Sequence, residues 1–331
     1  MKTMLVALVP VLTLSIAAAA YSQPTAHNAV RDYPNRPVRA IVPSVPGGGG
    51  DLSARIFASG LSDAFNMPFV IDNRGGAGGT LGTHIAAMAL PDGYTVLMGN
   101  IASHGINPAL FKDLPYHPIR DYAPVSLFGT TPNALVVHPS VPANTLKELI
   151  AYSKANPNAL RYGSSGVGGS PHLSMELLKT MTGMEMQHVP YKGAGAVLTD
   201  LLGGRVQVLS SSLPSQLAYI KSGKLRALAV TSKTRNAQTP DVPTVIEAGV
   251  PGYEVIIWYA MFVPAKVPKP IIAKLNATIV QVMAKPEMKA RLAQAGIDAA
   301  TSTPEELAAW VKVEVEKWTR VVKQANVVPE L

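Results

Sequence analysis

The stretch VRAIVPSVPGGGGDLSARIF, residues 38–57, contains the pattern that decides the fold. Residues 38–42 are mostly apolar and include two valines and an isoleucine, which predicts a short strand. Four glycines follow at 47–50, and Leu52 and Ile56 then recur at helical spacing. A strand, a glycine-rich loop and a helix in this order form the repeating unit of a parallel α/β sheet.

The glycine loop in this stretch also predicts an anion site. The first amides of a helix have no partner within the helix, and glycines let the backbone approach a ligand closely. Such a loop can bind an anion without any charged side chain. We expect Asp51 to be the N-cap of the helix rather than a ligand contact.

The same device occurs three more times, at NRGGAGGT (73–80), GSSGVGGSP (163–171) and PYKGAG (190–195). In the second of these loops Ser170 is suited to the N-cap and Pro171 to the first helical position. Any one loop is equally well explained as a tight turn between a strand and a helix. Four together favour a ligand site.

Strands and helices alternate along most of the chain, which predicts an α/β protein with two parallel-rich sheets flanked by helices. More strands are expected than one lobe needs, so we predict two lobes, 33–130 with 256–331, and 131–255. The expected strands cover residues 38–42, 69–71, 95–98, 134–137, 161–163, 187–190, 206–209, 226–230 and 255–263.

Two crossings between the lobes, near 127–137 and 253–263, would form a hinge. Ligands of open α/β sheets bind beyond the carboxyl ends of the strands. Glycine loops from both lobes would then face one cleft, which suits a ligand with one or two carboxylates.

Two amphipathic helices are expected near the C-terminus, at 270–284 and 304–326. Thr303 is a good N-cap for the second helix. We expect Trp310 and Trp318 to pack in the core or between helices rather than against a ligand.

The N-terminus has the pattern of a secretory signal peptide, with Lys2 followed by an apolar run and small residues. We predict a signal peptide at 1–22, cleaved before Gln23 or alternatively before Tyr21, then a linker at 23–32 and a periplasmic location. A membrane anchor is the less favoured alternative, because Pro10 interrupts a run of minimal length.

Composition narrows the function further. The chain of 331 residues has no cysteine and a net charge of +8, so lipid attachment through cysteine and thiol chemistry are excluded. A basic balance favours anionic partners, but lysine and arginine are dispersed rather than gathered in a stripe, so we expect no nucleic-acid partner.

Motifs for catalysis or cofactor binding are incomplete. No glycine run completes a dinucleotide or phosphate-loop motif. The seven histidines show no metal-ligand spacing, so we expect no cofactor and no metal. Residues 163–167 come close to the nucleophile motif of serine hydrolases. An esterase that uses Ser165 with His172 therefore stays an alternative.

Several stretches resemble the substrate-binding receptors of tripartite tricarboxylate transporters, the TctC or Bug family, and keep the family order over nearly the whole mature chain. The resemblance is carried by YPNRPVRAIVPSVPGGGGDLSAR, VIDNRGGAGGTLGTHIAAMALPDGYTVLMGN, INPALF, YGSSGVGGSPHLSMELL, HVPYKGAGAVLTDLLGGRVQVL, SGKLRALAVTS, DVPTVIEAGVPGYEV and FVPAKVPKPIIAKLN.

The resemblance implies a two-lobe periplasmic-binding-protein fold, type II-like, that is not an enzyme and acts as a monomer. It also implies a carboxylate held by loop amides, hydroxyls and water, and a membrane permease that accepts the loaded receptor. The ligand-binding residues that it implies are Val45, Pro46, Gly47, Gly48, Gly76, Ala77, Gly78, Ser103, His104, Ser164, Ser165, Gly166, Ser170, His172, Tyr191 and Ser211.

One segment departs from the family pattern. After the strand at Val206 the family often has an acidic residue suited to an amino group, whereas this chain has Leu209-Ser210-Ser211-Ser212. We expect a simple or aromatic carboxylate rather than an amino acid. A receptor that signals to a membrane kinase instead of a transporter is the remaining alternative.

Overall fold

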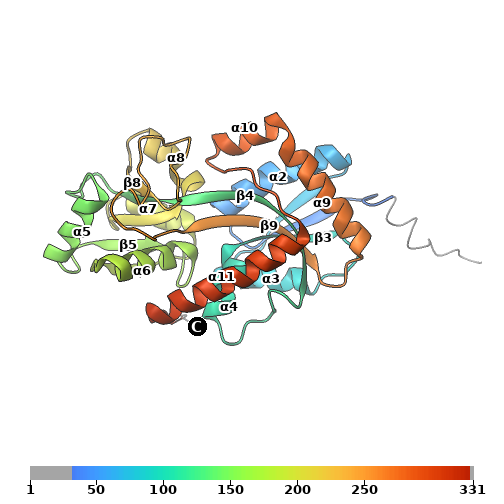
Figure 1. Ribbon diagram of the computed structural model, residues 1–331, viewed down its shortest axis with the longest axis horizontal. Coiled ribbons are helices and arrows are strands. Elements are labelled where there is room, and N and C mark those ends of the chain that lie inside the picture. The colour runs from blue at the N-terminus through green and yellow to red at the C-terminus, as the bar shows by residue number, and fades with distance from the viewer. Residues whose placement is uncertain (1–31, 329–331) are drawn as a thin grey trace, which may run out of the picture. The chain divides into compact units, whose positions relative to one another are not determined.

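A central feature of the computed structural model is one mixed sheet with the strand order β2-β1-β3-β9-β4-β7-β5-β6, to which β8 adds through β4 (Figure 1). The structure describes residues 32–328. The expected signal peptide at 1–22 and nearly all of the linker at 23–32 therefore lie outside the described residues. All elements below belong to one unit of the chain, Pro34–Leu331.

The first parallel group contains β1 (Val38–Val42), β2 (Phe69–Asn73) and β3 (Thr95–Asn100). Helix α2 (Gly49–Phe65) connects β1 to β2, and α3 (Thr80–Ala87) connects β2 to β3. In α2 the side chains of Ala54, Phe57 and Leu61 are buried at helical spacing, because this face of the helix packs on the strands. The strand–loop–helix pattern of residues 38–57 is thus confirmed.

The second parallel group contains β5 (Arg161–Ser164), β6 (Gln187–Pro190) and β7 (Val208–Ser212). Its flanking helices are α5 (Leu146–Ala155), α6 (Ser170–Thr182), α7 (Ala194–Leu202) and α8 (Leu213–Lys221), and β8 (Arg226–Val230) pairs with β4. An apolar core under α7 and α8 includes Val136, Leu201 and Leu213.

Two long strands join the two groups. β4 (Tyr122–Val137) pairs with β9 (Ile256–Pro264) from Tyr122 to Pro132, and with β7 from Asn133 onward. Figure 1 shows β4 and β9 side by side between the two groups. The sequence predicted only the last four residues of β4. Pro124 and Pro132 obscured the rest, because proline is unusual inside a strand.

The C-terminal region differs from the expectation in one helix. The expected helix at 270–284 is α9 (Lys269–Ala284), but a further helix, α10 (Pro286–Gln294), follows directly. Lys285 between them has an extended backbone, as is typical of a residue before proline. Helix α11 (Pro304–Gln324) packs on the short helix α4 (Asn107–Leu110) and on β4.

The N-cap of α11 is confirmed, since Thr303 Oγ1 accepts from the Glu306 amide in a full capping box. Trp318 is fully buried, and its indole N–H donates to Glu314. The core prediction is wrong for Trp310, which is 41% exposed. The buried stripe of α11 runs through Leu307, Val311 and Trp318, and Trp310 lies beside it.

Two other predicted helix caps are wrong. The N-cap of α2 is Gly48, with Asp51 three positions into the helix, and the N-cap of α6 is Gly169, with Ser170 as its first residue. Both helices begin earlier than their apolar periodicity indicated, because glycine and serine continue the helix toward the loop. Among residues 32–328, no helix is both long enough and apolar enough to cross a bilayer.

Candidate functional site

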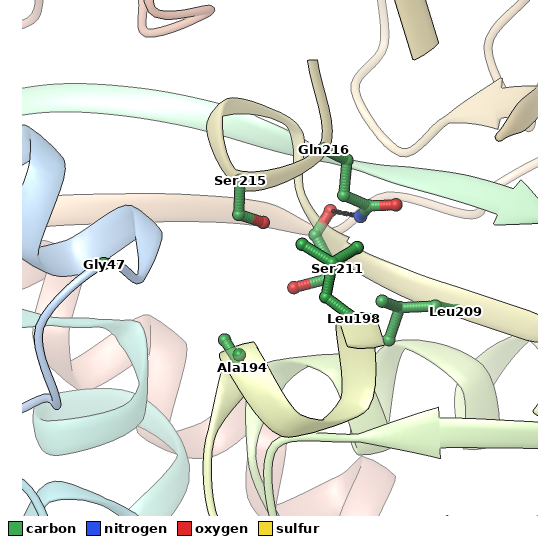
Figure 2. A pocket seen from close by; sticks show the side chains of 8 residues that line it. Gly47, Ala194, Leu198, Leu209, Ser211, Ser215 and Gln216 are labelled. Atoms are coloured by element: carbon green, nitrogen blue, oxygen red, sulfur yellow. Dashed lines mark hydrogen bonds between the residues drawn. The ribbon is translucent and has the colours of Figure 1, made fainter. Parts of the chain in front are cut away.

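A small cavity lies where the loop before α2 meets α7, β7 and α8 (Figure 2). Its volume is about 40 Å³, which is room for a few water molecules or a small polar group. The lining residues carry no net charge and combine backbone, hydroxyl, amide and aliphatic groups. They are Gly47, Ala194, Gly195, Leu198, Leu209, Ser211, Ser215 and Gln216.

Helix starts form much of the cavity wall. Gly47 lies two residues before α2, Ala194 and Gly195 are the first residues of α7, and Ser215 lies in the first turn of α8. The amides of these first turns have no intrahelical acceptor, and the helix dipoles add partial positive charge. The wall is therefore suited to oxygen atoms that carry negative charge.

Asp51 holds the loop of four glycines in place through hydrogen bonds. Its Oδ2 accepts from the Gly47 amide at 2.9 Å, and its Oδ1 accepts from Asn73 Nδ2 at 2.9 Å and pairs with Arg55 Nε at 2.9 Å. Burial raises the pKa of Asp51, but the hydrogen bonds from Arg55, Gly47 and Asn73 outweigh it and lower the pKa below its usual range. Asp51 is thus an ionised positioning residue, and it occupies the Gly47 amide.

Glycines allow the two groups of elements to approach each other at this site. A Cβ at Gly49 would collide with Ser212 Oγ and lie 3.1 Å from the Tyr259 hydroxyl. A Cβ at Gly193, before α7, would lie 3.3 Å from Val45 Cγ2. Gly168 leaves no room for a Cβ beside the Leu110 side chain. Each of these contacts joins the loops around β1–β3 to the loops around β5–β7.

Of the ligand-binding residues expected from the sequence, Gly47 and Ser211 line the cavity. Val45 and Pro46 are exposed on the same loop, and Gly48 is buried as the α2 N-cap. The loop before α3 contains Gly76, Ala77 and Gly78, and the Gly78 carbonyl accepts from Asn107 Nδ2 at 3.1 Å. Gly76 and Gly78 do not line the cavity.

Ser103 and His104 lie in the core instead of in the cavity wall, and both are fully buried. Ser103 Oγ donates to the Asn100 carbonyl at 3.0 Å. The His104 ring stacks on Phe262 with 3.7 Å between ring centres. Burial lowers the pKa of His104 to about 3, so the ring is neutral at physiological pH.

The glycine loop at residues 163–171 is hydrogen-bonded to a pair of stacked histidines. The rings of His172 and His188 stack with 3.8 Å between their centres. His172 Nδ1 accepts from the Gly168 amide at 2.9 Å, and Ser164 Oγ lies 2.7 Å from His188 Nε2. Ser164 also donates to the Gly166 carbonyl at 2.9 Å. These bonds shape the loop before α6.

The neighbouring residues of that loop do not form a catalytic pair. Ser165 is partly buried, and no hydrogen bond joins it to a histidine among the described residues. Ser170 Oγ is buried and has no hydrogen-bond partner among the described residues. The Tyr191 hydroxyl donates to Asp200 at 2.8 Å. Residues 32–328 also contain no group of histidine and acidic side chains that could hold a metal.

Sequence reasoning missed six residues of the cavity wall. Ala194 and Gly195 belong to a loop that the sequence did flag, while Ser215 and Gln216 belong to a helix start that it did not. Pro214, the second residue of α8, was the available signal, because proline is common in the first turn of a helix. The missed residues are Ala194, Gly195, Leu198, Leu209, Ser215 and Gln216.

The fold and the site define a class of protein. Two α/β groups, two connecting strands and a cavity at facing helix starts are the architecture of two-lobe solute-binding receptors. A family model described as tripartite tricarboxylate transporter family receptor matches residues 53–327. The chain belongs to this family, the TctC receptors.

Individual relatives agree with this assignment. Protein BugT of Bordetella pertussis is 34% identical over 320 residues, which is 96% of this chain and 97% of BugT. The structure of Rhodopseudomonas palustris Rpa4515 with adipate has a TM-score of 0.87 and 36% identity, and covers 90% of this chain and 100% of that one. The structure of MatC from R. palustris with bound malate has a TM-score of 0.81 and 32% identity, and it covers 88% of this chain and 100% of MatC.

The Asp51 network predicts a stability effect. Asp51→Ala removes the acceptor of the Gly47 amide and one of the two acceptors of Asn73 Nδ2, which keeps the Ser44 carbonyl, so we expect the free energy of unfolding to fall by roughly 2 kcal/mol. Urea denaturation followed by circular dichroism measures this change. Asp63→Ala, at an exposed position of the same helix, is the control and should change stability by less than about 0.5 kcal/mol. Equal stability of the two variants would contradict the assigned role.

The histidine pair predicts acid sensitivity. Burial lowers the pKa of His172 and of His188 to about 4. The charge of Glu176 raises both pKa values and that of Lys179 lowers them, but burial is the largest effect. The unfolded chain therefore binds more protons than the folded one below pH 6.5, and stability falls as the pH drops from about 6.5 to about 4. Melting temperatures across this range measure the slope.

A variant separates this pair from the other titrating groups. His188→Gln keeps a donor for Ser164 and removes one titrating ring, so it should make the loss of stability with acid shallower. The wild-type protein, measured in the same buffers, provides the reference slope. If His188→Gln retains this slope, the pair is not the source of the acid sensitivity.

Proposed function

We propose that this receptor captures a small carboxylate between its two lobes and delivers it to the membrane permease of a tripartite tricarboxylate-type transporter. One observation carries the proposal: the starts of α2, α7 and α8 converge on one cavity in whose wall the described residues place no charged side chain. First-turn amides without an intrahelical acceptor favour a bound anion, and a wall without a cationic side chain lets that anion be released again. The adipate and malate bound by similar proteins agree with this chemistry.

The lobes that we propose are 33–130 with 256–331, and 131–255. The pairing of β4 supports a boundary near residue 131, because β4 changes partner from β9 to β7 between Pro132 and Asn133. β4 and β9 would bend as the hinge when the lobes close on the ligand. The glycine contacts of Gly49, Gly168 and Gly193 would then form on closure.

The proposed ligand is a carboxylate without an amino group. Among the described residues, no aspartate or glutamate lines the cavity, and Ser211 supplies a neutral hydroxyl to its wall. Burying an ammonium beside neutral groups alone is costly. The chemistry of the wall is better matched to one carboxylate group of a simple dicarboxylate, tricarboxylate or aromatic carboxylate, and the cavity of about 40 Å³ has room for such a group rather than for the whole ligand.

We further propose that the receptor is periplasmic after cleavage of its signal peptide, that it acts as a monomer, and that it does no catalysis. The esterase alternative has no support, since the Gly168 amide occupies His172 Nδ1. No feature of residues 32–328 favours a kinase-linked sensor over a transport receptor.

Titration calorimetry tests the ligand class. We expect adipate, citrate or terephthalate to bind with micromolar or tighter affinity, and aspartate and glutamate to bind at least tenfold more weakly. Ser211→Asp should reverse this order, because a carboxylate in the wall repels the anion and pairs with an ammonium. Ser222→Asp, at an exposed position outside the cavity, is the control. Tighter binding of amino acids by the wild-type protein would contradict the proposal.

Closure of the two lobes on the ligand predicts that a substitution at Gly49 weakens carboxylate binding. Gly49→Ala places a methyl group against Ser212 and Tyr259, so carboxylate affinity should fall at least tenfold. Gly203→Ala is the matched control, because a Cβ there would make only ordinary contacts of 3.5 Å or more and the residue does not line the cavity. Adding Ser212→Gly to Gly49→Ala should restore part of the affinity. Equal affinities of Gly49→Ala and Gly203→Ala would show that this contact does not form in the bound state.

A further inference from the structure

The hydroxyl of Tyr259 lies where the two proposed lobes meet, inside the protein. Tyr259 belongs to β9 and is 3% exposed. A Cβ added to Gly49, at the start of α2, would lie 3.1 Å from the Tyr259 hydroxyl and would collide with Ser212 Oγ. Gly49 and Tyr259 belong to the lobe 33–130 with 256–331, and Ser212 belongs to the lobe 131–255. Elements of both lobes therefore meet at this hydroxyl.

Two serines, one from each lobe, are hydrogen-bonded to Tyr259. Burial raises the pKa of Tyr259, and the hydrogen bonds of its side chain with Ser53 and Ser212 lower it. Ser53 lies on α2, whereas Ser212 is the last residue of β7 and the N-cap of α8. Tyr259 and Ser53 lie in the same lobe, so the bond with Ser212 is the one that crosses from lobe to lobe.

The tyrosine ring is held in place by its own lobe. It stacks on Phe128 with 6.0 Å between ring centres, and Phe128 stacks on Phe57 with 4.2 Å between ring centres. The preceding residue of β9 points to the opposite face of the strand, where Trp258 Nε1 donates to Glu314 of α11 at 2.9 Å. All of these residues belong to the lobe 33–130 with 256–331. The position of the hydroxyl is therefore set by one lobe alone.

The bond that crosses between the lobes lies beside the cavity. Ser212 directly follows Ser211, which lines the cavity, and Gly49 lies two residues after Gly47, which lines it from the other lobe (Figure 2). The approach of the two loops that encloses a ligand group thus also brings Ser212 to Tyr259. Hydrogen bonds weaken steeply beyond their usual distance, so a displacement of about 1 Å between the lobes is enough to break this bond.

We propose that Tyr259 is a positioning residue for ligand capture, whose hydroxyl bonds to Ser212 only when the lobes are closed and thereby slows the release of the bound anion. The inference rests on the proposed capture of a carboxylate by lobe closure, and it names a contact that stabilises the closed form. Because the contact forms after the ligand has entered, it acts on dissociation rather than on association. Tyr259 does not line the cavity, so it acts without touching the ligand.

Release kinetics test the proposal. The probe is whichever of adipate, malate, citrate and terephthalate binds the wild-type protein most tightly in titration calorimetry. Tyr259→Phe keeps the ring and removes only the hydroxyl, so we expect koff to rise about fivefold, as for the loss of one net hydrogen bond. The association rate constant should stay within about twofold of the wild-type value. Stopped-flow tryptophan fluorescence measures both rates, with Trp258 next to the substituted position as a reporter.

A matched control separates closure from stability. Tyr116 is 4% exposed, and its hydroxyl donates to the Ser103 carbonyl at 2.6 Å within the lobe 33–130. Tyr116→Phe should therefore lower the melting temperature without changing koff.

Ser212→Ala removes the other partner of the bond and should also raise koff. Combined with Tyr259→Phe it should add nothing further, because both substitutions break the same contact. Ser212→Ala decides the proposal even if Tyr259→Phe does not fold.

The outcomes separate this inference from the proposed function. If carboxylates bind but Tyr259→Phe and Ser212→Ala release them at the wild-type rate, the inference is overturned while the carboxylate receptor stands. An equal rise of koff in Tyr116→Phe also overturns it, because the loss of any buried hydroxyl would then have the same effect. If no carboxylate binds at all, the proposed function fails and this inference fails with it.

Discussion

The amides in the first turns of α2, α7 and α8 have no partner inside their own helices, and the whole site depends on this constraint. A helix cannot satisfy these groups by itself. The chain directs three such helix starts at one cavity and lines the rest with hydroxyl, amide and aliphatic groups. Side chains in the loops hold these helix starts in place. At the start of α2, Asp51 is bonded to Gly47, Asn73 and Arg55.

Small residues make this convergence sterically feasible. Gly49 meets Ser212, and Gly193 meets Val45, at positions where a side chain on the glycine would hold the backbones apart. The four glycines at 47–50 therefore do not all have the same role. Gly47 provides a bonded amide, Gly48 caps α2, and Gly49 permits close approach.

The sequence allowed the α/β class, the two parallel groups and the four glycine loops to be predicted, because these features depend on local pattern. It placed the N-caps of α2 and α6 incorrectly, since glycine gives no periodic signal at the start of a helix. The burial of His104 could not be predicted either. Its stacking partner Phe262 lies far away in the chain, and only the pairing of β3 with β9 brings the two together. Gln216 escaped notice because the start of α8 follows no glycine loop.

The place of β9 in the sheet sets the order in which the molecule can be completed. β9 lies between β3 and β4, so these two strands never contact each other directly as neighbours. A chain made from its N-terminus has β1, β2 and β3 available early, but the edge of β3 stays open until residue 256 and its successors have been synthesised. Such distant pairing raises the contact order and slows folding. The growing chain thus stays without a finished first sheet for most of its synthesis, and its final assembly waits for a strand near its end.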